Sequence, residues 1–156
     1  MKRMLQTILI LFVLAAALSA YSLWANKVPW NESPGFWNRL LVYVTQNVAE
    51  TDEQASFPEL RPRTYPIEAK YLLDELTQHI IALDWNLVSV DAEKLELTAT
   101  VQSRWLKFTD DITLRLEPLP NKQTRLHIRS ASRLGRADYG ANLRHIIRLN
   151  WNLQAL

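Results

Sequence analysis

The feature that most constrains this chain is an uncharged apolar run near its N-terminus. After Lys2 and Arg3, the run from Met4 to Ala25 has no charged residue in 22 positions. As a helix it rises about 1.5 Å per residue, so it is long enough to cross a hydrocarbon core of about 30 Å. The run therefore predicts a transmembrane helix over residues 1–26, which contacts a lipid bilayer through residues 4–25.

The flanks of this run predict how the chain is oriented. Basic residues before a span favour a cytoplasmic N-terminus, and aromatic residues prefer the membrane interface. Tyr21, Trp24 and Trp30 follow the apolar run, where the far interface would lie. We therefore predict a single-pass protein of the bacterial inner membrane, with a cytoplasmic N-terminus and a periplasmic C-terminal domain.

The alternative is a cleaved signal peptide, which also has a basic start and an apolar stretch. A cut after Ala20 would have Leu18 at the minus-three position, where a small residue is required, whereas a cut after Ser19 would have Ala17 there. The uncleaved anchor is favoured, because span length and aromatic flank fit it better than the cleavage site fits a signal peptide. Both alternatives place the domain on the same side of the membrane.

Composition excludes several classes of function. The chain of 156 residues has no cysteine, so it can hold no disulfide, thiolate metal site or thiol nucleophile. Its net charge of +2 is too small to indicate nucleic acid, and no nucleic-acid partner is predicted. The three histidines have no metal-ligand spacing and no glycine-rich phosphate loop is present, so we predict no metal and no cofactor.

Residues 27–50 predict a juxtamembrane amphipathic helix. The apolar positions recur at helical spacing opposite a polar set. The apolar set is Phe36, Trp37, Leu40, Leu41, Val44 and Val48, and the polar set is Asn38, Arg39, Gln46 and Glu50. Two alternatives stay open: the apolar stripe lies on the bilayer or receives a partner, or it docks on the domain. Residues 51–63 are rich in proline and predict an extended linker.

Residues 64–156 predict an α+β domain. A helical stripe indicates a helix over 67–83, and four runs of alternating apolar and polar residues indicate strands. The strands are predicted over 85–90, 95–104, 111–117 and 124–132, with a short extra strand over 63–66. A final helix has Tyr139, Leu143, Ile146, Ile147 and Leu153 on its inner face and Arg144, His145, Arg148 and Asn152 on its outer face. The pattern predicts a two-layer α-β-β-β-β-α domain, an antiparallel sheet of four to five strands with two helices on one face.

Several stretches resemble a known family. WLKFTDDITLRLEP and LHIRSASRLGRADYGANLRHI are similar to the C-terminal signature of the domain-of-unknown-function family 1499, and FPELRPRTYP and LDWNLVSVD look like its earlier blocks. The resemblance covers about residues 48–156. It implies a small α+β domain found in bacterial envelope proteins and plastid relatives, and it implies no activity. Ala137 stands where the family pattern often has serine.

No catalytic residues are predicted. Asp110 and Asp111 are adjacent, but neighbouring residues of a strand point to opposite faces, so they cannot act together as acid and base on one substrate. We expect one to hold a turn and Asp111 to pair with Arg129 or Arg115 on the charged face.

The best candidate site is the arginine-rich corner between the last strand and the last helix. Asp138 is expected to cap the helix, Gly135 to adopt a positive φ angle, and Gly140, in the first helical turn, to allow close backbone approach. The full set of structural residues is Gly135, Asp138, Gly140, Asn142 and Asp111, and the candidates for anion or partner binding are Arg133, Arg136, Arg129 and Arg144. The structural account of the corner is favoured over an anion site. Arg133 and Arg136 have no structural explanation in the sequence, so a phosphate, carboxylate or anionic lipid at the helix N-terminus stays the alternative.

Two classes of function follow. The favoured one is a non-catalytic accessory or assembly protein, which contacts an envelope protein complex through its charged sheet face and amphipathic helix. The alternative is a helix-grip-like module that binds an apolar or anionic, lipid-like ligand between the sheet and the last helix. An enzyme is the least favoured class.

Overall fold

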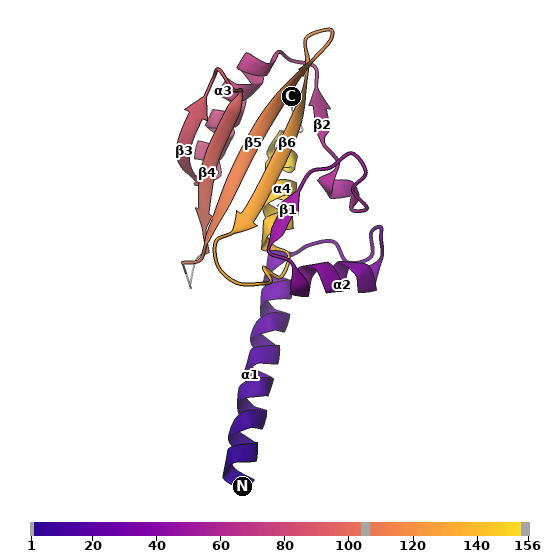
Figure 1. The fold of residues 1–156 in the computed structure, drawn as a ribbon, viewed down its shortest axis with the longest axis vertical. Helices are drawn as coiled ribbons and strands as arrows, with labels where there is room; N and C mark the ends of the chain where they lie inside the picture. The colour runs from indigo at the N-terminus through magenta and orange to yellow at the C-terminus, as the bar shows by residue number, and fades with distance from the viewer. Residues whose placement is uncertain (1, 104–106, 154–156) are drawn as a thin grey trace.

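The computed structural model describes residues 2–103 and 107–153. A long helix, α1 (Lys2–Asn26), projects from the domain like a stalk (Figure 1). Its side chains from Lys2 to Leu18 are exposed, and its mean hydropathy reaches 2.2. The helix is therefore long and apolar enough to cross a membrane, as the sequence predicts.

The domain is built on one antiparallel sheet of six strands. The strands are β1 (Val48–Glu50), β2 (Arg63–Tyr65), β3 (Asn86–Asp91), β4 (Glu96–Gln102), β5 (Thr109–Leu119) and β6 (Gln123–Ser132). Their order is β1-β6-β5-β4-β3, and β2 pairs with another part of β6. The α+β prediction is confirmed, with the extra strand at Arg63–Tyr65. The end of the second predicted strand at Arg104 lies outside the described residues.

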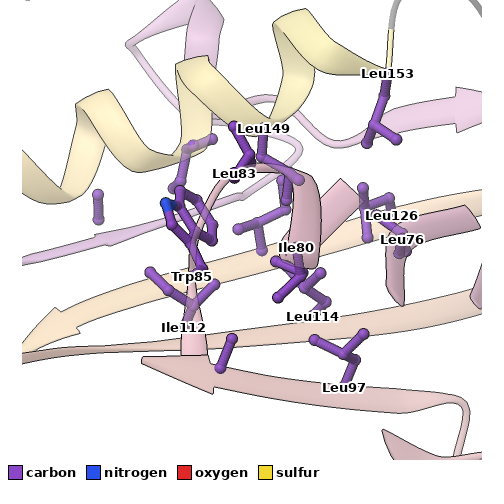
Figure 2. Close-up of a cluster of buried hydrophobic side chains, with 14 of the residues drawn as sticks. Leu76, Ile80, Leu83, Trp85, Leu97, Ile112, Leu114, Leu126, Leu149 and Leu153 are labelled. Atoms are coloured by element: carbon purple, nitrogen blue, oxygen red, sulfur yellow. The ribbon is translucent and has the colours of Figure 1, made fainter. Parts of the chain in front are cut away.

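Two helices, α3 (Ala69–Ala82) and α4 (Ala141–Asn152), cover one face of the sheet (Figure 1). Their apolar stripes meet the apolar positions of the strands, because alternation places every second strand residue on the same face. Figure 2 shows this layer, in which Leu76, Ile80 and Leu149 from the helices face Leu97, Ile112, Leu114 and Leu126 from the strands. All seven are at most 1% exposed, so side chains occupy the space between the two layers.

The segment between α1 and the domain differs from its prediction. The amphipathic helix α2 covers only Phe36–Thr45, and Val48–Glu50 forms strand β1 instead of a last helical turn. Backbone pairing of β1 with Arg129–Ala131 of β6 replaces the helical hydrogen bonds that those residues would otherwise make. Sequence periodicity could not reveal this partner, because it lies about 80 residues further along the chain.

The predicted linker at residues 51–63 packs on the domain. It contains the 3₁₀ helix η1 (Pro58–Leu60), and the side chain of Phe57 is in the core. The hydroxyl of Thr51 accepts a hydrogen bond from the Ile128 amide at 2.9 Å. The proline-containing segment is therefore part of the folded domain and follows one defined path along its surface.

Candidate functional site

The corner, defined as residues 133–140, joins β6 to α4 through three residues with positive φ. They are Gly135, Tyr139 and Gly140, with φ of +93°, +54° and +82°. A Cβ atom on Gly135 would meet no atom nearer than 3.6 Å, so only its φ requires glycine, as predicted. A Cβ on Gly140 would lie 3.1 Å from the side chain of Val28. Gly140 therefore provides both the turn and the predicted close approach.

Asp138 lies two residues before Gly140, the N-cap of the last helix, and its side chain reaches the amides at the helix start. Its two carboxylate oxygens accept hydrogen bonds from the amides of Gly140 and Asn142, at 2.8 and 2.9 Å. Burial raises the pKa of Asp138, and the hydrogen bonds from these amides oppose that rise. Gly140 is left-handed and precedes the first helical residue, so it lies just outside the predicted first turn. The amides that would hold an external anion are thus occupied by a residue of the chain itself.

Asn142 connects the corner to the sheet. Its side chain is fully buried, and its Oδ1 accepts a hydrogen bond from the Ser130 hydroxyl. Its Nδ2 donates to the Asn47 carbonyl at 2.8 Å and to the Ser132 hydroxyl at 3.0 Å. Both serines therefore have this buried amide as a hydrogen-bond partner.

The corner also holds the C-terminal end of α2. The Asp138 amide donates to the Gln46 carbonyl and the Tyr139 amide to the Tyr43 carbonyl, each at 3.0 Å. The Nδ2 of Asn47 donates to the Gly135 carbonyl at 2.7 Å. The last carbonyls of a helix lack partners within the helix, so the corner stabilises the end of α2 by supplying donors.

The end of α1 is bound at the same place. The Arg144 guanidinium donates to the Ala25 carbonyl at 2.8 Å, and Asn26 donates to the Tyr139 carbonyl at 2.8 Å. The Ser19 hydroxyl donates to the Tyr139 hydroxyl at 3.1 Å. A cation at a helix C-terminus is favourable, because the last carbonyls carry partial negative charge. Arg144, predicted on the outer face, therefore joins the apolar helix to the domain.

The arginine pairs differ from the predicted pairs. Arg133 donates to both carboxylate oxygens of Asp111, with a shortest distance of 2.7 Å, and this contact lowers the pKa of Asp111. Arg129 lies 3.5 Å from Glu50 on β1, and Arg115 pairs with Glu96. The predicted pairing of Asp111 with Arg129 or Arg115 is therefore wrong.

The sheet register explains why Asp111 pairs with Arg133 and not with Arg129. Asp111 lies opposite Ala131, so Arg129 and Arg133 are both diagonal neighbours of it. Arg133 follows the last residue of β6, and its guanidinium makes a two-pronged contact with the carboxylate. Arg133, which had no structural explanation in the sequence, thus serves as the ion-pair partner of Asp111.

Arg136 is the exception among the candidate arginines. It is exposed, and it makes no hydrogen bond or ion pair with the residues that the structure describes. Leu134, two residues earlier, is 69% exposed. Leu134 and Arg136 are therefore the two residues of the corner whose exposed side chains have no structural role in the described fold.

Two further polar contacts were missed by the sequence. Asp110 was expected in a turn and His145 on an outer face, but Asp110 lies in β5 and its carboxylate is 3.0 Å from the His145 ring, at the edge of Trp85. Arg39, expected on the polar face of α2, is fully buried and meets the Glu59 carboxylate at 3.0 Å. Charged residues are normally predicted to lie on the protein surface. The burial of these side chains becomes apparent only when the partner of each is known from the tertiary structure.

The family described as a protein of unknown function, DUF1499, matches residues 42–153. The chain belongs to the DUF1499 family. The predicted resemblance is confirmed, and the matched DUF1499 region includes β1, the whole corner and α4, but not α1. No curated protein matches the chain.

The DUF1499 domain carries two surface hollows outside the core layer. One, of about 390 Å³, lies between α2, β1, η1 and the corner. The other, of about 470 Å³, lies on the charged outer face of the sheet and is lined by Glu50, Thr113, Arg115, Glu117, His127 and Arg129 among others. Within residues 2–103 and 107–153, no three side chains of the metal-binding types gather at one point.

Proposed function

We propose that this DUF1499 protein is a non-catalytic accessory or assembly protein of the bacterial inner membrane, with α1 as its uncleaved anchor and its domain in the periplasm. The observation that carries the proposal is the junction at the corner. Arg144 and Asn26 bind the end of α1 to the domain, and the amides of Asp138 and Tyr139 bind α2. Arg144, Tyr139 and the amide of Asp138 hold these elements together, and Arg133 is paired with Asp111. These structural roles favour a fixed presenting scaffold over a reaction site.

The face that such a scaffold would present is the outer face of the sheet. Its hollow carries both signs of charge, with Arg115 and Arg129 beside Glu50 and Glu117. Exposed pairs of this kind contribute little to stability, but they suit selective contact with a complementary protein surface. We propose that this face contacts an envelope protein.

Cross-linking in cells tests this contact. A photoreactive amino acid at Thr113, in the hollow, should form one defined adduct, and the same group at Tyr71 of α3, on the helical side, should not. Arg115→Glu with Arg129→Glu should abolish the adduct, and Lys70→Glu should leave it intact. Adducts of equal yield at both positions, or insensitive to charge reversal, would show that this face has no selective partner.

A second experiment tests the compartment. A C-terminal fusion to a reporter that fluoresces only when it folds in the cytoplasm should remain dark in this orientation. Bright cells would overturn the periplasmic placement.

The ligand-binding alternative has less support. The space between the sheet and α4, where a helix-grip ligand would lie, is occupied by side chains such as Leu114 and Leu149 (Figure 2).

A further inference from the structure

The outer face of α2 carries an apolar stripe that the domain does not cover. Trp37, Leu41 and Val44 recur at spacings of four and three residues, and they are 77%, 61% and 39% exposed. The face that packs on the domain is the one with Arg39 and Tyr43, both at most 1% exposed. Because Arg39 and Tyr43 are buried against the domain, the apolar side of the helix faces outward.

This stripe lies where α1 leaves the domain. In Figure 1, α2 lies crosswise to α1, at the end of the domain from which α1 projects. Tyr139 joins the two helices directly, because its amide bonds to Tyr43 of α2 and its carbonyl and hydroxyl bond to Asn26 and Ser19 of α1. If α1 crosses a bilayer, α2 is thus held at the level of its surface.

The chemistry of the stripe fits that surface. The only charged residue of α2 is the buried Arg39, so its outer face has no charge to keep in water. Tyr21 and Trp24 of α1 are exposed at 57% and 72%, as expected for aromatic side chains at a membrane interface. An amphipathic helix that binds a membrane surface lies in the plane of the interface, with its apolar face about 5–10 Å into the boundary between headgroups and acyl chains.

We infer that α2 is a second membrane contact, which lies in the interface of the leaflet from which α1 emerges and inserts Trp37, Leu41 and Val44. The inference rests on the proposed function in one respect, because it requires α1 to span the bilayer. The loop between β6 and α4, which includes the exposed Leu134 and Arg136, reaches the same end of the domain (Figure 1), where the headgroups would lie. Two attachments restrict the tilt and rotation of the domain, whereas a single span alone would leave them free.

The absence of cysteine makes the test direct, because single cysteines can carry a nitroxide in the otherwise unchanged full chain. The protein is placed in vesicles of phosphatidylethanolamine and phosphatidylglycerol with no other protein. Labels at Leu41→Cys and Trp37→Cys report the stripe, and a label at Asn38→Cys is the matched control on the same helix. Phe12→Cys reports the span, and Tyr71→Cys reports the far side of the domain.

Accessibility to oxygen, which concentrates in lipid, is compared with accessibility to a water-soluble nickel chelate. The labels at Leu41, Trp37 and Phe12 should favour oxygen, and those at Asn38 and Tyr71 should favour the chelate. A Leu41 label as water-accessible as Asn38, with Phe12 still in lipid, would overturn the inference and leave the anchor intact. A water-accessible Phe12 label would overturn both. Shielding of Leu41 that disappears when the protein is diluted in lipid would assign the stripe to a second copy and also overturn the inference.

Discussion

Replacing Asn142 with alanine tests whether the buried amide holds the corner to the sheet. The substitution removes the acceptor of the Ser130 hydroxyl and the donor to Asn47 and Ser132. The Asn47 carbonyl keeps one partner, the Ser132 amide at 2.9 Å, and the Ser132 hydroxyl is partly exposed and can bond to water. The Ser130 hydroxyl is fully buried, so it is left without a partner.

These losses set the magnitude. An unsatisfied buried hydroxyl costs about 1–3 kcal/mol. Each of the two other lost hydrogen bonds costs only about 0.5 kcal/mol, because its remaining group keeps another partner or bonds to water, so we expect a loss of about 2–4 kcal/mol. That is a large part of the ~5–15 kcal/mol that stabilises a typical domain. At about 4 °C per kcal/mol for a domain of this size, the midpoint of thermal unfolding should fall by about 8–16 °C.

The assay is thermal unfolding of the detergent-solubilised full chain, followed by near-ultraviolet circular dichroism. Asn152→Ala is the matched control, because this exposed asparagine of the same helix donates only to the Arg148 carbonyl. Ser130→Ala in the Asn142→Ala background removes the orphaned hydroxyl, so the double variant should be no less stable than Asn142→Ala alone. Losses that add, or an Asn142→Ala effect no larger than that of the control, would refute the reasoning.

Three further predictions use the same unfolding measurement. Gly140→Ala should lower stability more than Gly135→Ala, because both acquire a strained positive φ of roughly 1–2 kcal/mol but only the first also meets a neighbouring side chain; equal losses would contradict the close approach. Arg39→Lys should cost about 1–3 kcal/mol, because an ammonium group cannot reproduce the planar contacts of the buried guanidinium, and a neutral result would contradict this role. The contact with Arg133 lowers the pKa of Asp111 in the folded protein. The stability that this ion pair adds is therefore present above the pKa of the unfolded chain and is lost as the pH falls below about 4. The difference in stability between wild type and Arg133→Gln should shrink in that range, and a constant difference would exclude the pair.

Local sequence pattern was sufficient for the elements whose burial follows their own periodicity. The alternation in β4, β5 and β6 and the stripes of α3 and α4 place apolar residues on the faces that are buried. The contact of Asp138 with the amides at the helix start and the positive φ of Gly135 depend on residues within a few positions of each other. Local geometry alone decides such features.

The rest depended on partners far apart in the chain. Arg144 meets Ala25 across 119 positions and Asn142 meets Asn47 across 95, and no local pattern encodes either contact. The rotation of α2 was set by burial of Arg39 against Glu59, which outweighed its apolar stripe. The sequence by itself therefore determined an apolar helix, an α+β domain and a capped corner between strand and helix. Only the tertiary structure decided that this corner joins α1 and α2 to the domain, because donors and acceptors separated in sequence find each other only after the sheet has formed.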